Sequence, residues 1–447
     1  MAIINFNSIS GVSTISVASS ITVGNNVSIG TDRVTATTFT GALTGNVTGN
    51  VTGNVTGNVT GSVNSTGVTT ITTLNATSIV GVTTAGITTA YIGAINDGPI
   101  SGARNRIING DMRIDQRNAG ASGTATGKYT VDRWYYYAVQ ASKGTWQQNA
   151  GSVTPPTGFT NYLGYTSSSA YSAASGDFFG LSHVIEGYNI SDLAWGTSSA
   201  KTVTLSFWVR SSLTGQFGAF LKNGGNDVAG NNTRYYVFYY NINSSNTWEY
   251  KTVTIPGDTS GSWDSTNGSG LGIAFSLGAG STYTGGTAFT WGGTFYNQPS
   301  GSVNIVGTNG ATFYITGVQL EAGTVATPFE RRSYGQELAL ARRYFQRIYD
   351  PPMRGVGTGG TNGGASRLCL FFPNTMRALP TLTTGGTFSF WNGSVTATGG
   401  TVAGYFQGGP DGMDLDITIS GAFTIGHAVC AYCQASTSKY VDLTAEL

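Results

Sequence analysis

Three carboxylates gather in one short segment near the C-terminal end of the chain. The sequence Asp411-Gly-Met-Asp414-Leu-Asp416 places Asp414 and Asp416 on one face of any strand that contains them, because strand side chains alternate with a period of two. Carboxylate oxygens are ligands that Ca²⁺ takes in proteins. The segment is therefore a candidate calcium site, and an acidic, glycine-rich turn without a metal is the alternative.

Aromatic side chains in loops rich in Gly, Ser and Asn are a second source of chemistry. Sugar-binding surfaces present aromatic rings to the apolar faces of pyranoses, while amide and carboxylate groups bind the hydroxyls. The aromatic residues in such a setting are Trp263, Tyr283, Trp291, Tyr296, Trp391 and Tyr405. Aromatic residues within strands, such as those of Tyr135–Tyr137 and Phe207–Trp208, are more often core. Burial in a core is also the alternative for each of the loop residues.

Hydrolytic chemistry finds little support in the sequence. Glycoside hydrolysis needs two carboxylates about 5 to 10 Å apart, and no spacing among the 21 acidic residues singles out a pair. No G-x-S-x-G motif occurs, and two histidines leave few options for a serine triad. The G-x-G-x-x-G match at Gly355–Gly360 is not followed by a helix pattern, so we interpret it as a hinge. We expect no enzyme, and no cofactor beyond a possible structural calcium.

Composition excludes further classes of function. Gly accounts for 66 of 447 residues and only 10% are charged, which is typical of a β-rich, turn-rich protein. A net charge of +1 disfavours nucleic acid as a partner. We find no signal peptide and no run long enough to span a membrane, so we expect synthesis in a cytosol and no membrane insertion. We expect the three cysteines to be buried free thiols, with a metal or redox site at Cys430 and Cys433 as the alternative.

A four-residue repeat dominates the N-terminal part of the chain. From Gly41 to Asn64 six tetrads follow one another, each with Gly first and Val or Leu third. In a strand, Gly and Val then share one face and Asn and Thr the other. A single strand cannot bury its Val stripe, so we expect a homotrimeric β-stalk over residues 1–95, with a seam at Val47, Val51, Val55 and Val59. A flexible linker is the alternative.

The rest of the chain predicts an all-β fold with two further domains. Short aromatic or β-branched runs separated by turn residues are typical of a jelly roll, which we expect over residues 96–330. Its predicted strands are Val131–Val139, Val203–Val209, Tyr235–Tyr240, Trp248–Ile255, Leu271–Leu277 and Thr312–Leu320. A C-terminal β-sandwich is predicted over residues 351–447, with strands at Leu368–Phe372, Thr387–Trp391, Leu415–Ile419, Ala428–Tyr432 and Tyr440–Leu443.

One helix is predicted between these domains, over residues 331–350. Ser333 and Gln336 have the spacing of a capping box, and Asp350-Pro351-Pro352 is a stop signal. Apolar residues at coiled-coil spacing, including Leu338 and Phe345, predict a trimer seam and a possible three-helix bundle. Packing against a sheet of the same subunit is the alternative.

Several motifs resemble bacteriophage tail fibre proteins. Asn105-Arg-Ile-Ile-Asn-Gly-Asp-Met-Arg-Ile-Asp-Gln-Arg and Tyr129-Thr-Val-Asp-Arg-Trp134 resemble the opening of the jelly-roll, carbohydrate-binding-module-like domain of such fibres. Tyr314-Ile-Thr-Gly-Val-Gln-Leu-Glu-Ala-Gly and Thr327-Pro-Phe-Glu-Arg-Arg resemble its end. Phe372-Pro-Asn-Thr-Met-Arg and the terminal Thr444-Ala-Glu-Leu447 look like the C-terminal domain of such fibres. The tetrads resemble the stalks of fibres from phages with marine hosts.

The resemblance implies a homotrimeric fibre of the virion tail, made in the host cytoplasm and displaying its C-terminal β-domain as the distal tip. It implies a phage tail or baseplate protein as partner of the N-terminal end, and a bacterial surface glycan as receptor. It also implies a structural calcium near Asn109–Asp111 and Glu321, where such modules often bridge their first and last strands. A fibre with glycan depolymerase activity, and a structural segment that carries another adhesin, are the alternatives.

Overall fold

The computed structural model describes residues 104–224, 233–349, 351, 354–356, 365–386, 388–391, 396–418, 428–432 and 439–447. The chain divides into two compact units, Met1–Gly86 and Ile87–Leu447, and every described residue lies in the second. The predicted stalk and its seam residues Val47, Val51, Val55 and Val59 lie outside the described residues.

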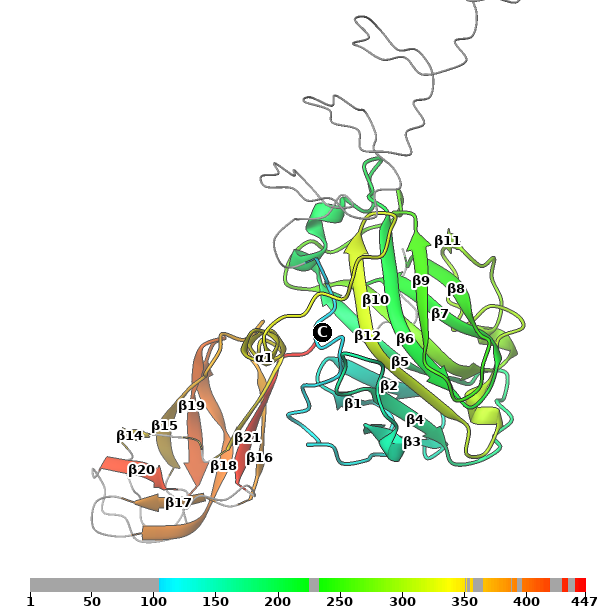
Figure 1. Cartoon of the computed structure of the whole chain (residues 1–447). Coiled ribbons are helices and arrows are strands. Elements are labelled where there is room, and N and C mark those ends of the chain that lie inside the picture. Colours follow the sequence, from blue (N-terminus) through cyan, green and yellow to red (C-terminus); the bar gives the residue numbers. More distant parts are fainter. Residues whose placement is uncertain are drawn as a thin grey trace, which may run out of the picture. The chain divides into compact units, whose positions relative to one another are not determined.

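Two antiparallel sheets form a β-sandwich (Figure 1). The seven-stranded sheet has the order β1 (Lys128–Val131), β2 (Trp134–Ala138), β5 (Phe178–Glu186), β10 (Ser269–Ala279), β7 (Gly215–Asn223), β8 (Tyr235–Ile242) and β11 (Thr290–Gly292). The five-stranded sheet has the order β3 (Gly144–Gln148), β4 (Leu163–Ser167), β12 (Thr312–Ala322), β6 (Val203–Ser211) and β9 (Glu249–Ile255). Successive strands such as β5, β6 and β7 alternate between the sheets, as the strands of a jelly roll do.

Short 3₁₀ helices punctuate the connections of the sandwich. They are η1 (Ala150–Ser152), η2 (Gly187–Asn189), η3 (Ser191–Leu193), η4 (Ser281–Tyr283) and η5 (Ile305–Gly307). Within the described part of the chain, no helix has the length and apolar character that crossing a membrane requires.

The all-β fold class is confirmed, and most predicted strands of the sandwich lie where the sequence places them. The exception is Val131–Val139, which is the turn and second strand of a hairpin, because β1 and β2 pair with Val131 opposite Trp134. Arg133, in the turn, has a φ of 72°. A run of strand-forming residues does not reveal such a tight turn, since Asp132 and Arg133 carry no Gly or Pro signal.

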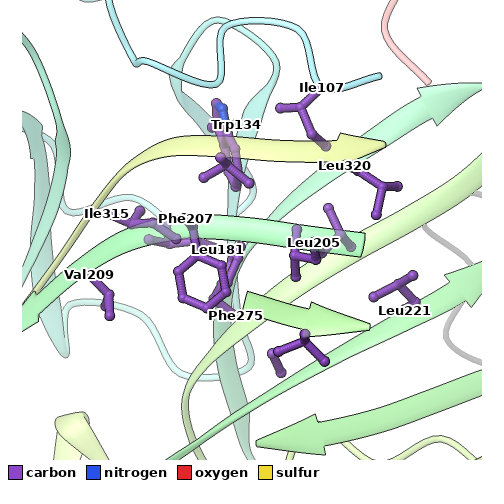
Figure 2. Close-up of a cluster of buried hydrophobic side chains, with 14 of the residues drawn as sticks. Ile107, Trp134, Leu181, Leu205, Phe207, Val209, Leu221, Phe275, Ile315 and Leu320 are labelled. Carbon is purple, nitrogen blue, oxygen red and sulfur yellow. The ribbon is translucent and has the colours of Figure 1, made fainter. Parts of the chain in front are cut away.

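The core lies between the two sheets and is built from side chains that point inward at every second position. Leu181, Phe207 and Phe275 are fully buried there (Figure 2). The Phe207 and Phe275 rings, from opposite sheets, meet at a centroid distance of 5.0 Å in a T-shaped arrangement. Aromatic pairs of this geometry stabilise a core beyond the apolar area that they bury.

The C-terminal strands form a small sheet and a barrel. The three-stranded sheet has the order β13 (Phe345–Tyr349), β21 (Tyr440–Thr444) and β16 (Thr381–Gly385). The closed barrel has the order β14 (Arg354–Val356), β15 (Ala365–Phe371), β19 (Gly412–Thr418), β18 (Thr396–Gly408), β17 (Phe388–Trp391) and β20 (Ala428–Tyr432). The strands were predicted as a sandwich. They close because β20 pairs with both β14 and β17, which leaves no free edge.

The predicted helix over residues 331–350 is only half as long in the structure. Helix α1 spans Tyr334–Arg342, and the predicted capping box of Ser333 and Gln336 is confirmed. Phe345 lies in β13 instead, opposite Thr444 of β21, so the continuous helical seam is wrong. Leu338 packs within the subunit, in a cluster with Ile108, Ile114, Ala341 and Tyr344. Pairing with a strand about a hundred residues away decides the conformation here, and local propensity cannot show it.

The opening motif of the described chain is fastened to the last strand of the sandwich. The Asn105 side chain donates to the Val318 carbonyl at 3.1 Å and accepts from the Leu320 amide at 3.1 Å. The Val318 amide donates to the Gly110 carbonyl, and a Cβ atom on Gly110 would lie 2.2 Å from the Val318 oxygen. Asn105 and Gly110 are therefore needed for packing against β12.

The C-terminal residues are fastened to the sandwich by a buried ion pair. Arg133 is 1% exposed, and its guanidinium bonds to the Glu446 carboxylate and to the Val184 carbonyl. It also lies 3.6 Å from the centroid of the Tyr344 ring. Glu446 accepts a second bond, of 2.8 Å, from Arg117. A buried guanidinium requires such partners, because an unpaired charge is costly in an apolar setting.

Glu446→Gln is expected to lower the free energy of unfolding by about 3 kcal/mol, because it leaves the charge of Arg133 buried without a carboxylate. Asp192→Asn, at a side chain that is 53% exposed beside Arg106, is the matched control. Its cost should be clearly smaller, because the Asp192 carboxylate is largely solvated and Arg106, at 8% side-chain exposure, keeps its bond to the Asn189 carbonyl. Urea unfolding measures both values, and equal costs for the two variants would contradict the role given to Glu446.

Candidate functional site

The central strand of the seven-stranded sheet has large side chains on one face and small ones on the other. In β10 the inward-pointing residues of the core are Leu271, Ile273, Phe275 and Leu277. The outward-pointing positions between them hold Gly272, Ala274 and Ser276. Along β10, therefore, only short side chains project from the outer face of the sheet.

The neighbouring strand β5 continues this low surface. Ser182 lies opposite Ala274, Gly180 opposite Ser276, and Val184 opposite Gly272. On the other side of β10, Phe220 of β7 lies opposite Ala274. Small residues thus form a floor two strands wide, bordered by larger side chains.

Aromatic residues form the walls above this floor. Tyr135 and Tyr137 come from β2, Phe220 from β7 and Tyr235 from β8, and Phe178 and Phe295 stand at one end. The Phe295 ring lies 5.6 Å from Phe178, 5.4 Å from Phe220 and 5.2 Å from Tyr235. The walls and floor enclose a volume of about 220 Å³, which we call the sheet hollow.

Hydrogen bonds hold the loop that carries Phe295 against the sheet. Tyr137 donates to Asn297 Oδ1 at 2.7 Å, and Asn297 Nδ2 donates to Ser276 Oγ at 2.7 Å and to the Phe179 carbonyl at 3.1 Å. Burial raises the pKa of Tyr137 well above its usual value, so its hydroxyl stays a donor. The hydrogen bonds of Tyr137 and Asn297 thus fix the end of the sheet hollow at Phe295.

The polar groups of the sheet hollow are few. Lys222 is the one charged residue among the described residues that line it, and none of them is Asp or Glu. Neither the Ser182 hydroxyl nor the Tyr135 hydroxyl has a hydrogen-bond partner within the described ranges. Both residues are half-buried and line the hollow. An apolar hollow with a few polar groups is typical of a small-molecule binding site.

Two of the aromatic residues predicted to bind sugar, Trp263 and Trp291, belong to a cluster with Trp195. The three rings lie 4.7 to 5.5 Å apart in T-shaped contacts, and they pack against the main core. Each indole N–H donates to a backbone carbonyl: Trp263 to Ser260, Trp291 to Pro256 and Trp195 to Lys201. Both rings are half-buried and contribute to packing, and neither Trp263 nor Trp291 lines the sheet hollow. A role of these two residues in sugar binding stays a prediction.

Tyr283 and Tyr296 contact wall residues of the sheet hollow but do not line it. The Tyr283 ring contacts Phe178 at 4.8 Å and Phe295 at 5.2 Å. Tyr296 is half-buried in the satellite cluster of Phe220, Tyr235 and Val237. These two residues support wall residues of the hollow and do not line it.

The C-terminal candidates are not gathered into one site. Trp391 lies in β17 and Tyr405 in β18, but their side chains fall outside what the structure describes. Asp414 accepts a hydrogen bond from the thiol of Cys369. Cys369 is exposed, so the prediction that it is buried is wrong. Asp411 accepts from Thr375 Oγ1. The side chains of Cys430 and Cys433 also lie outside what the structure describes.

The two predicted calcium positions have carboxylates with protein partners among the described residues. Among the described residues, no group of three His, Cys, Asp or Glu side chains could hold a metal, and this includes Asp411, Asp414 and Asp416. At the second predicted position, Glu321 accepts bonds from the Thr327 amide and hydroxyl and from Gln319. Asp111 pairs with Arg113 at 3.1 Å. Binding of calcium stays a prediction.

The wall residues of the sheet hollow are the ones that the sequence analysis missed. Their place within a strand favours the core for all of Tyr135–Tyr137, yet only Tyr136 points inward, at 1% exposure. A period of two across this run could have shown that Tyr135 and Tyr137 share the opposite face. The same alternation in Leu271–Leu277 could have shown the floor. Which face lies beside which strand could not be read from either run.

The comparisons with solved structures give matches at low identity and low TM-score. No protein-family model matches the chain, and no curated protein matches it. The chain is similar to the enzymatically active domain of bacteriophage CBA120 tailspike protein 4, with 13% identity and a TM-score of 0.26. That match covers 49% of this chain and 21% of the tailspike domain, so the chain spans about a fifth of that structure.

Two carbohydrate-binding modules are similar as well. The family 11 module from Clostridium thermocellum, in complex with a β-1,3-1,4-mixed-linked tetrasaccharide, has 13% identity and a TM-score of 0.23, over 46% of this chain and 98% of the module. The CBM22-2 xylan-binding domain from Paenibacillus barcinonensis has 17% identity and a TM-score of 0.25, over 45% of this chain and 98% of the domain. Similarity at this level does not bear on ligands, which have to be inferred from the sheet hollow itself.

Trp263→Ala is expected to lower the free energy of unfolding by about 3 kcal/mol, because it removes one ring from a packed cluster of three. Tyr188→Ala, at a ring that is 60% exposed, is the control. Its cost should be under about 1 kcal/mol. Urea unfolding of both variants gives the comparison, and a Trp263 variant as stable as the control would contradict a packing role.

Proposed function

We propose that the sandwich binds a saccharide in the sheet hollow. The observation that carries the proposal is the floor of small residues on β5 and β10 between aromatic walls, with little charge. Pyranose rings have apolar C–H faces and a rim of hydroxyls, and aromatic rings contact such faces well. The small residues of the floor leave room for a flat ring between the aromatic walls. A side chain larger than Ala at the centre of the floor would occupy that room.

Polar groups of the sheet hollow would fix the orientation of the sugar. The hydroxyls of Ser182 and Tyr135 can each donate and accept a hydrogen bond. Groups of this kind bind sugar hydroxyls in concert with aromatic contacts.

The proposed activity is binding without hydrolysis. Glycoside cleavage uses a pair of carboxyl groups beside the scissile bond, and the residues described as lining the sheet hollow supply none. New reducing ends, released from the bound polysaccharide by the purified protein, would favour a depolymerase instead. A depolymerase would need its carboxylates elsewhere on the chain.

At the level of the particle, we propose a homotrimeric bacteriophage tail fibre that attaches to a bacterial surface polysaccharide. The tetrads between Gly41 and Asn64 and the motifs around Asn105 and Thr327 support this proposal. Its N-terminal end would bind a phage tail or baseplate protein, and its place would be the virion tail. Three weak sites on one fibre would gain avidity, because the first contact raises the local concentration of the others.

Ser182→Leu is expected to abolish saccharide binding, because a leucine side chain would stand in the floor between Tyr135 and Ala274. Thr290→Leu is the matched control: Thr290 lies in β11, is exposed and does not line the hollow. Full-length protein is applied to an array of neutral and acidic oligosaccharides, and calorimetry with the strongest binder gives the Kd. Equal binding by the two variants would rule out the sheet hollow as the site.

The fibre proposal predicts a trimer in solution. Sedimentation equilibrium of the full chain should give three times the subunit mass of 46.4 kDa. A chain without residues 41–64 should associate more weakly, because the apolar stripe of the tetrads is then missing. A stable monomer of the full chain would refute the trimer while leaving the sheet hollow as a sugar site.

A further inference from the structure

The outer face of the five-stranded sheet carries a second hollow that the proposed function does not use. It has a volume of about 460 Å³ and lies over β6, β9 and β12, on the opposite side of the sandwich from the sheet hollow. Its lining includes four aromatic residues and one charged residue, Arg331.

The four aromatic residues form two pairs, one on neighbouring strands and one in loops. Trp208 of β6 lies opposite Tyr250 of β9, and their ring centroids are 5.4 Å apart. Phe159 and Phe329 form a second pair at 5.2 Å. Tyr250 is 44% exposed, and the other three rings are half-buried, so all of them can be reached from solvent. We call these four residues the aromatic strip.

Gly317 lies between the two aromatic pairs, next to Phe159 of one and Trp208 of the other. Gly317 has a φ of 62° and lies where the register between β12 and β6 shifts. A Cβ atom on Gly317 would lie 2.7 Å from the Phe159 ring and 3.2 Å from the Trp208 ring. Both rings therefore approach the same point, and only glycine leaves room for them there.

Arg331 stands over the strip with its hydrogen-bonding capacity unused. Its guanidinium carbon lies 4.6 Å from the centroid of Phe159 and 5.6 Å from that of Phe329. The side chain is exposed, and within the described ranges its guanidinium has neither a hydrogen-bond acceptor nor an ion pair. By contrast, the adjacent Arg332 donates to Asn105, Ile107 and Glu337. Arg331 is held in place by rings while its N–H groups stay available.

We propose that the aromatic strip and Arg331 form a second saccharide site, specific for a pyranoside that carries an anionic group. The sugar would lay its apolar face on Trp208 and Tyr250, and its anionic group would accept hydrogen bonds from Arg331. Guanidinium binds carboxylate and sulfate through two parallel N–H bonds, and rings on its flat face do not block that edge. The site does not depend on the sheet hollow, which lies on the other sheet.

The charge around the strip favours an anionic ligand. Burial raises the pKa of Asp111, and the charges of Arg113 and, to a smaller extent, Arg331 act against this rise; the Asp111 carboxylate pairs with Arg113 at 3.1 Å. No Asp or Glu is among the residues described as lining this hollow. A positive group on the ligand would be repelled by Arg331, and the described lining residues include no carboxylate that would offset this repulsion.

The test measures binding of three trisaccharides to the full chain by calorimetry: trigalacturonate, a sulfated galactotriose and neutral galactotriose. We expect one or both acidic trisaccharides to bind, and Arg331→Gln to weaken that binding about tenfold or more, as loss of a charged hydrogen bond does. Arg331→Lys should retain part of the affinity, because it keeps the charge but not the paired bonds. Trp208→Ala should also weaken binding.

Ser182→Leu separates the two sites, because it blocks the sheet hollow and leaves the strip intact. The acidic trisaccharide should bind this variant as it binds the unmodified chain. Thermal melting of each variant checks that the fold is kept. The proposal is overturned if neither acidic trisaccharide binds, if Arg331→Gln binds as tightly as the unmodified chain, or if Ser182→Leu abolishes acidic binding. A comparison of the carboxylated and sulfated ligands shows which anionic group the site takes.

Discussion

The alternation of side chains in the central strands of the seven-stranded sheet is the constraint on which the sandwich depends. β10 and β5 direct Leu181, Ile273, Phe275 and other large residues into the core, and their Gly, Ala and Ser residues between these point outward. A shift of the strand by one residue would exchange the two sets. The core would lose its filling, and the outer face would lose its floor. A single register therefore determines both the stability of the fold and the shape of the sheet hollow.

Polar groups complete what the alternation begins. The Asn297 side chain donates a hydrogen bond to Ser276 Oγ and accepts one from the Tyr137 hydroxyl. These bonds hold the loop with Phe295 over the sheet. Buried polar groups with all partners satisfied make a loop rigid, whereas unsatisfied ones would destabilise it. The walls of the hollow are thus formed before any ligand arrives, which lowers the ordering cost of binding.

Charges are used in two different ways on this chain. Buried ones bind segments that are distant in the sequence: Glu186 bonds to Arg343 at 2.8 Å and to the Tyr344 hydroxyl at 2.6 Å. Burial alone would raise the pKa of Glu186, but the hydrogen bonds from Arg343 and Tyr344 lower it, so the carboxylate stays ionised. Arg331 is the opposite case, because the side chain is exposed and its guanidinium has no hydrogen-bond acceptor or ion-pair partner among the described residues. The first arrangement fits a structural role and the second a ligand.

The sequence by itself determined the all-β class, the positions of most strands and the capping box at Ser333, because alternation and capping are local patterns. It did not determine that Phe345 belongs to a strand, since its partner Thr444 lies far away in the chain. It also selected Trp263 and Trp291 as sugar-binding residues, whereas the fold packs both with Trp195. The walls of the sheet hollow come from β2, β5, β7, β8 and a loop. Only the pairing of strands brings such residues together, because register between distant segments is a property of the tertiary structure and of no single stretch of sequence.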